Sequence, residues 1–321
     1  MTQLLDPATL AKLRPLGLRA QRIAQGVWAG MHASPSKGAS IEFAEHKQYS
    51  QGDELRHLDW KIYGKSDKLF VKQFEAETNI AALFVLDTSG SMGYCGAQMS
   101  PDINPADVDT GADRRGQDLG TGQVSKLAYA AMMSAGLAHL LQGQQDAVGL
   151  ACGASKLDLF VPPRPGPKQL AQLFHELEAI EPKGESHLRE LLRPVLEAHR
   201  RRTLILLFTD GFDLTEDDWA ALRQLRSRGH EISFFQMLDP YEMSFPFQSW
   251  SDFQGLEGEQ PVQVDPMAQR ESYLRRIDAF VDDVRERCIQ SEISYLRVLT
   301  SEPVDRPLLT YLLSRNRGGA R

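Results

Sequence analysis

Two carboxylates and three hydroxyls are the side chains of this sequence best suited to chemistry. One set directly follows an apolar run over residues 79–86, another follows a second run over residues 203–208, and one hydroxyl lies in a polar segment before a predicted helix. The five residues are Asp87, Ser89, Ser91, Ser186 and Asp210. All offer oxygen, the donor atom that Mg²⁺ prefers in proteins. They predict a site for one divalent ion, Mg²⁺ or Mn²⁺, with positions left for water and for an outside ligand.

Common enzyme motifs are absent from the sequence. It contains no G-x-x-x-x-G-K-[ST], which excludes a P-loop, and no G-x-S-x-G, because Asp87 stands where the first glycine would be. A metal-dependent hydrolase of phosphoesterase type stays open as an alternative, although no residue is placed as a dedicated general base. A purely structural role is also open, in which Asp87 caps a turn and the serines cap a helix, but it leaves Asp210 and Ser186 unexplained.

Alternating strands and helices must position these residues. Continuous apolar runs are typical of strands buried on both faces, as in parallel sheets, and helical segments lie between them. Strands are predicted over residues 79–87, 146–152, 203–211, 231–238 and 293–300, and helices over 124–141, 216–228 and around 274–288. Residues 156–163 follow the preceding strand too closely for a crossover helix, so they predict an antiparallel edge strand. The fold class is therefore α/β, with a doubly wound, mostly parallel sheet.

The chain divides into two predicted parts. Residues 1–78 form a front module with a helix and β-rich pieces, and residues 79–321 form the α/β domain. Within that domain, residues 94–123 are a polar insertion with five Asp, five Gly and no apolar periodicity, which favours a solvated, disordered segment. Residues 253–264 predict a small hairpin.

Composition and charge narrow the function classes. The 321 residues are 42% hydrophobic and 25% charged, with a net charge of -7, which argues against a general nucleic-acid binder. The three cysteines, Cys95, Cys152 and Cys288, show no C-x-x-C spacing, so we expect neither a disulfide framework nor a cysteine zinc site. The longest apolar runs are far shorter than the ~20 residues that cross a bilayer. We expect a cytoplasmic protein without a membrane span.

The three oxygen-bearing elements resemble the metal-ion-dependent adhesion site of von Willebrand factor A domains. The resemblance rests on Asp-x-Ser-x-Ser at Asp87, a Gly-x-Ser loop that ends in Ser186, and Thr-Asp-Gly around Asp210, in that order along the chain. It implies a Rossmann-like fold in which Ser89 and Ser91 ligate the metal directly and the two aspartates bind directly or through water. Ser186 stands where the family usually has Thr.

Most of the chain also resembles a bacterial domain-of-unknown-function family, number fifty-eight in its series. The resemblance rests on Tyr49-Ser-Gln-Gly-Asp-Glu-Leu-Arg-His-Leu-Asp-Trp60, on Phe70-Val-Lys-Gln-Phe-Glu-Ala-Glu77 and on Asp239-Pro-Tyr-Glu242. Gln51 replaces the usual Pro, and the polar insertion is a second departure. Members of that family are typically encoded beside MoxR-type AAA+ ATPases, and many carry N-terminal membrane helices.

These resemblances imply a function in protein recognition. The chain is expected to be an adaptor or cofactor of a MoxR-type AAA+ ATPase and its client proteins. A metal-ion-dependent adhesion site would then bind an acidic side chain of the partner. The hydrolase remains the alternative, and a scaffold with a vestigial metal site is a third possibility.

Overall fold

The computed structural model of the protein describes residues 23, 24, 27, 46–48, 70–72, 81–96, 124–197, 202–257 and 260–318. The chain forms two compact units, Ser34–Asn79 and a larger unit made of Met1–Ala33 and Ile80–Arg321. The boundary predicted after residue 78 stays a prediction. From residue 97 on, the predicted insertion 94–123 lies outside the described residues. In the smaller unit, β1 (His46–Gln48) pairs antiparallel with β2 (Phe70–Lys72).

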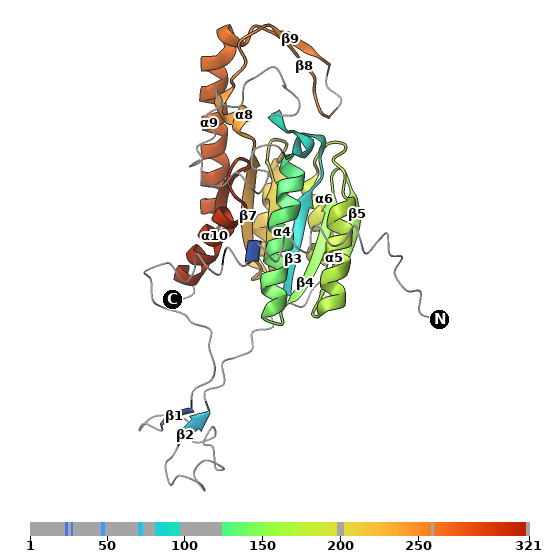
Figure 1. Ribbon diagram of the computed structural model, residues 1–321, viewed down its shortest axis with the longest axis vertical. Coiled ribbons are helices and arrows are strands. Elements are labelled where there is room, and N and C mark those ends of the chain that lie inside the picture. Colours follow the sequence, from blue (N-terminus) through green and yellow to red (C-terminus); the bar gives the residue numbers. More distant parts are fainter. Residues whose placement is uncertain are drawn as a thin grey trace, which may run out of the picture. The chain divides into compact units, whose positions relative to one another are not determined.

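A six-stranded sheet forms the centre of the larger unit (Figure 1). Its strands are β3 (Ala81–Asp87), β4 (Ala147–Gly153), β5 (Leu157–Arg164), β6 (Thr203–Thr209), β7 (Glu231–Leu238) and β10 (Ser294–Leu299). They lie in the order β10-β7-β6-β3-β4-β5, and every neighbouring pair is parallel except β4 with β5. The predicted mostly parallel sheet with one antiparallel edge strand is confirmed.

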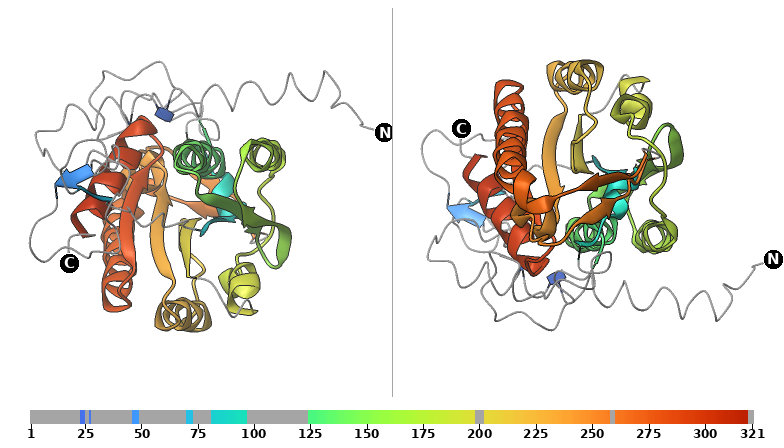
Figure 2. Two further views of the ribbon diagram at one scale, coloured as in Figure 1. Left: turned by 90° about the horizontal axis from the view of Figure 1, so that it is seen from below. Right: turned by 90° about the horizontal axis from the view of Figure 1, so that it is seen from above.

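Helices cover both faces of this sheet (Figure 2). The described part of the chain holds seven α-helices: α4 (Lys126–Gly143), α5 (Pro167–Ala179), α6 (Leu188–Glu197), α7 (Glu216–Ser227), α8 (Pro240–Ser244), α9 (Pro266–Gln290) and α10 (Asp305–Gly318). Side chains of α4, α5 and α10 share one apolar core with one face of the sheet. Those of α6, α7 and the C-terminal half of α9 form a second core on the other face. None of the described helices is both long and apolar enough to span a bilayer.

Helix α4 is the most buried helix, as its apolar sequence predicts. Ser125 caps it by accepting a hydrogen bond from the Ala128 amide, and most of its side chains are buried. A Cβ at Gly136 would lie 2.8 Å from Ile23 Cγ2 and 3.2 Å from Leu308 Cδ1, so α4 is covered closely from outside as well. This double contact explains why the helix has no polar face.

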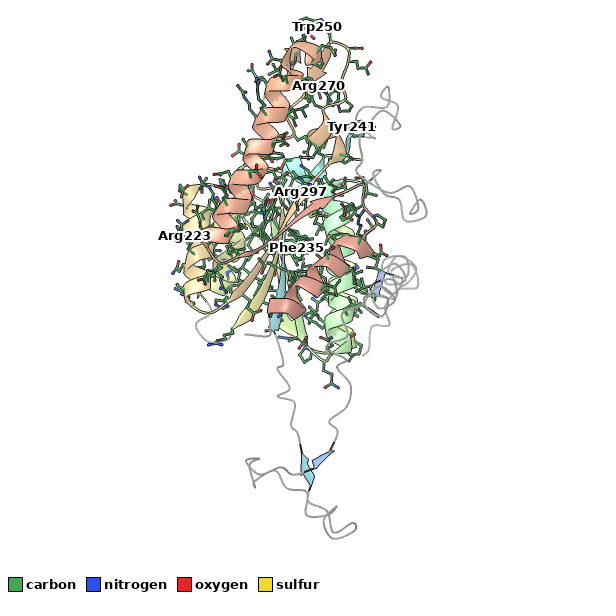
Figure 3. All side chains as sticks on the ribbon, turned by 90° about the vertical axis from the view of Figure 1, so that its left-hand side faces the viewer. Arg223, Phe235, Tyr241, Trp250, Arg270 and Arg297 are labelled. Atoms are coloured by element: carbon green, nitrogen blue, oxygen red, sulfur yellow. The ribbon has the colours of Figure 1, made fainter. Side chains whose placement is uncertain are left out.

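The segment between β7 and the body of α9 leaves the sheet and folds back over its end. After α8, strands β8 (Ser251–Phe253) and β9 (Val262–Val264) pair antiparallel, which is the hairpin that the sequence predicts. Phe245 stacks on Tyr273 of α9 with ring centroids 4.4 Å apart, and Arg270 donates to the Ser244 carbonyl oxygen at 3.0 Å. These contacts fix the base of the hairpin to α9, with Trp250 at the end remote from the sheet (Figure 3).

Candidate metal centre

The five predicted site residues come from three neighbouring segments at one end of the sheet. Asp87 is the last residue of β3, and Asp210 follows the last residue of the adjacent parallel strand β6. Ser89 and Ser91 lie at the start of the 3-10 helix η2 (Gly90–Gly93), and Ser186 precedes α6. Since parallel strands end at the same edge, the chain order places all three segments together.

Backbone hydrogen bonds join the loop after β3 directly to the segment before α6. The Gly90 amide donates to the Gly184 carbonyl oxygen at 2.8 Å, and the Lys183 amide donates to the Thr88 carbonyl oxygen at 2.7 Å. This pair of bonds fixes the Ser186 loop against the loop that follows β3. Behind Asp210, Gly211 adopts a φ of 82°, which favours glycine, so the chain can turn away from the sheet there.

Asp87 is the centre of the hydrogen-bond network. Its Oδ1 accepts from the Ser89 amide at 2.9 Å, and its Oδ2 accepts from Ser186 Oγ and from Thr209 Oγ1, both at 2.8 Å. The residue is only 1% exposed. Burial, helped by the negative charge of Asp210, raises the pKa of Asp87 to about 6, although the three hydrogen bonds oppose the rise. The neutral donors around this carboxylate thus compensate its charge only in part.

The two serines of the first segment present their hydroxyls to each other. Ser89 Oγ lies 3.1 Å from Ser91 Oγ. Ser89 occupies the N-cap position of η2, but its side chain makes no capping hydrogen bond to that helix. Asp87 thus caps a turn, since its Oδ1 accepts from the residue two positions on, whereas Ser89 does not cap the helix.

Asp210 lies beside Asp87 but is paired with a lysine. Lys126 Nζ lies 2.8 Å from Asp210 Oδ2 and 2.6 Å from Glu242 Oε1, and its side chain is fully buried. The ammonium group also lies 4.9 Å from the centroid of the Phe212 ring, within the range of a cation–π interaction. Burial alone would lower the pKa of Lys126, but the two carboxylates outweigh it and raise that pKa. Burial raises the pKa of Glu242 to about 7.

Sequence reasoning missed Lys126, and it also missed Glu257, in the connection between β8 and β9. Its Oε1 accepts a hydrogen bond from the Ser91 amide at 3.0 Å. Directly before it, the carbonyl oxygen of Leu256 is so near η2 that a Cβ at Gly90 would lie 2.2 Å from it. The hairpin therefore crosses over the first segment of the site, as Figure 2 shows from above.

The oxygen atoms of the predicted site residues suit a small, hard cation, with one exception. Within the described residues, no group of three or more His, Cys, Asp or Glu side chains gathers as a metal site. The candidate set relies on hydroxyls instead. Mg²⁺ ligands at ~2.1 Å in octahedral geometry lie about 3 Å apart. Ser89 Oγ and Ser91 Oγ, at 3.1 Å, and Asp87 Oδ2 and Ser186 Oγ, at 2.8 Å, have that spacing. Asp210 is the exception, because Lys126 already neutralises its Oδ2.

A scan against protein families matches this chain over residues 45–102 and 111–281 to the family described as "Protein of unknown function DUF58". The chain belongs to the DUF58 family. The match covers more than half of the chain and confirms the second resemblance. All five predicted site residues of this DUF58 chain lie within the matched residues, together with Lys126, Glu242 and Glu257.

Other relatives of the DUF58 chain include uncharacterised proteins of Mycobacterium tuberculosis and Mycobacterium bovis. Each is 24% identical over 320 residues, which cover 98% of this chain and 92% of the relative. Similar solved structures include the conserved hypothetical protein BatB from Bacteroides thetaiotaomicron (15% identity, TM-score 0.45) and an aerotolerance-related membrane protein from Bacteroides fragilis (15% identity, TM-score 0.44). In both, the similarity covers 74% of this chain and 99% of the other.

Proposed function

We propose that this chain is a metal-dependent protein-interaction module of the von Willebrand factor A type, with Mg²⁺ or Mn²⁺ held by Asp87, Ser89, Ser91 and Ser186. The observation that carries the proposal is the buried carboxylate of Asp87. The donors that surround it are neutral hydroxyls and an amide, and two further hydroxyls lie beside it at a spacing that suits a divalent ion. Asp210, paired with Lys126, lies next to this set.

The topology of the sheet supports a ligand site at this position. Numbered in chain order within the sheet, the six strands lie in the order 3-2-1-4-5-6, which is the order of doubly wound Rossmann-like folds. In such folds, ligands bind outside the carboxyl ends of the strands where the order reverses, between the first and fourth strands. Here those strands are β3 and β6, which end at Asp87 and next to Asp210.

The residues of the proposed site have different roles. A bound divalent ion would supply the positive charge that attracts an acidic side chain. Asp87 orients the loop of Ser89 and, through Oδ2, the hydroxyl of Ser186. Lys126 neutralises Asp210 and so limits the repulsion between the two aspartates, which lie close enough for Asp210 to raise the pKa of Asp87. The arrangement suits reversible recognition of a carboxylate.

The partner we propose is a MoxR-type AAA+ ATPase, with the DUF58 chain as its adaptor. The resemblance stated above supports this partner. The acidic ligand would then come from the ATPase or from one of its client proteins.

Isothermal titration with Mg²⁺ and with Mn²⁺ tests the metal site. Removing outer-shell partners of a metal typically costs about 10- to 100-fold in affinity, so Ser89→Ala combined with Ser91→Ala should cost at least as much. Ser134→Ala is the matched control, because Ser134 is also a buried serine and its hydroxyl has no partner among the described residues. Equal affinities in the double variant and the wild type would contradict the proposal.

A pull-down of a MoxR-type ATPase from the same genome tests the partner. We expect retention in Mg²⁺ and loss both in EDTA and with Asp87→Ala. Retention that survives both changes would contradict recognition through the metal.

A further inference from the structure

The hairpin between β7 and α9 contacts the candidate site at its far end. Glu257 carries a carboxylate to the Ser91 amide, at 3.0 Å, although the two residues are 166 positions apart in the sequence. The backbone at Leu256 lies against Gly90, where only a residue without a Cβ fits. The two backbones therefore approach closely at this point, and the contact does not depend only on the position of one long side chain.

The base of the same segment contacts the site a second time. Glu242 of α8 accepts from Lys126 Nζ, which also bonds Asp210, and Glu242 Oε2 accepts from the Asp239 amide at 2.8 Å. Asp239 and Glu242 form a capping box at the start of α8, so Glu242 is fixed in place by its own backbone. The segment is thus attached on both sides of the candidate site, through Asp210 at its base and through Ser91 at its tip.

Glu257 carries the same functional group as the ligand expected from a partner. Under the proposed function, the outside ligand is the carboxylate of a partner, and it must approach beside the Ser89 and Ser91 hydroxyls. Glu257 is a carboxylate that the chain itself already holds beside Ser91.

We propose that Glu257 is an internal ligand of this site, which the β8–β9 hairpin holds in the place of the partner's acidic side chain, so that hairpin and partner bind in competition. The inference rests on the proposed function. It adds that the site is closed in the free chain and opens when the hairpin moves away from η2. A tethered ligand acts at an effective concentration of the order of millimolar, so an outside carboxylate must overcome it.

Water-proton relaxation of bound Mn²⁺ in the full chain tests this inference. If Glu257 ligates the ion, Glu257→Ala admits one more water, and an ion that keeps two or three waters then gives a relaxation enhancement about 1.3- to 1.5-fold higher. Gly90→Ala should give the same increase by a different route, because its Cβ forces the Leu256 backbone away. Acetate should lower the enhancement in both variants at roughly 10-fold lower concentration than in the wild type.

Two controls accompany these variants. Glu271→Ala removes an exposed carboxylate of α9, and Gly143→Ala adds a Cβ where nothing lies within 4 Å. Both should match the wild type.

The experiment distinguishes a failure of the proposed metal site from a failure of the proposed internal ligand. If the wild type binds no Mn²⁺, the proposed function fails. If it binds Mn²⁺ and Glu257→Ala leaves the enhancement unchanged, the metal site stands and the internal ligand is refuted. An increase in Gly90→Ala alone would also refute it, because the hairpin backbone and not the carboxylate would then exclude water. An equal increase in Glu271→Ala would show a general effect of charge and would refute it as well.

Discussion

Replacing Asp87 by Asn should make the metal-free protein more stable while it removes metal binding. The amide is nearly isosteric with the carboxylate, and its oxygen can still accept from the Ser89 amide. Its NH₂ group can donate to Ser186 Oγ and Thr209 Oγ1, because hydroxyls accept as well as donate. The substitution therefore removes one buried negative charge and keeps the hydrogen-bond geometry.

The size of the effect follows from the pKa of Asp87. Burial and the charge of Asp210 raise this pKa from 3.8 to about 6. Each pKa unit corresponds to about 1.4 kcal/mol, so the ionised carboxylate costs the folded state about 3 kcal/mol at pH 8. A carboxyl group with a raised pKa contributes most to stability below its unfolded pKa, and that contribution is lost as the pH rises through the folded pKa. The gain from Asn should thus grow from about 0.5 kcal/mol at pH 4 to about 3 kcal/mol at pH 8.

Urea unfolding of wild type and Asp87→Asn in EDTA, at pH 4, 6 and 8, measures this gain. Asp283→Asn is the control, since this exposed aspartate pairs only with Arg287 among the described residues, and its free energy of unfolding should change by less than about 1 kcal/mol. Adding Mg²⁺ should stabilise the wild type and leave Asp87→Asn unchanged. A variant that is less stable than the wild type at pH 8, or a gain that is the same at pH 4 and pH 8, would refute the reasoning.

Further substitutions address the groups around the site. Lys126→Met leaves the carboxylates of Asp210 and Glu242 buried without their cation, so it should cost about 3–5 kcal/mol of unfolding free energy at pH 8, measured by urea unfolding. Because Glu242 already has a pKa of about 7, its protonation should reduce that loss below pH 6, and Glu242→Gln should rescue part of it at pH 8; an equal loss at every pH would contradict this account. Gly149→Ala places a Cβ 2.6 Å from the backbone nitrogen of Pro163, so it should lower the thermal midpoint through a loss of about 1–3 kcal/mol, whereas Gly143→Ala should not.

The sheet could be predicted from the sequence because its strands are buried on both faces. Continuous apolar runs over β3 and β6 permit few other structures, and the short connection before β5 leaves no room for a crossover helix. The helix predicted after Thr215 begins there because Thr215 and Asp218 form a capping box. In each case, the information lies within about ten consecutive residues.

The candidate site could be predicted only where it depends on the same local information. Asp87, Ser89 and Ser91 are neighbours in the sequence, and Asp210 follows from the rule that parallel strands end at one edge. Lys126 could not be predicted, because a lysine in the first turn of a helix is normally solvated. Its burial depends on the return of α8 to the site, through Glu242.

The position of Glu257 depends on a longer chain of tertiary contacts. It requires the hairpin to turn back over η2, and this turn is set by packing of Phe245 on Tyr273 and by the missing side chain at Gly90. No periodicity or short motif encodes such contacts. For the same reason, the sequence could not reveal that Ile23 joins the apolar core beside Gly136 of α4.

The balance of charge explains why one site would use both a lysine and a metal. Asp210 and Glu242 share the ammonium group of Lys126, which cannot leave because it is fully buried. Asp87 lies near Asp210, and its bonded donors are neutral, so it has no such permanent cation. An ion taken from solution would meet one full carboxylate and three hydroxyls there, a set with less charge than a tight calcium site. Its affinity should therefore depend on a further carboxylate. Glu257 or the side chain of a partner can supply that carboxylate, so metal binding and partner binding should each strengthen the other once the hairpin has opened.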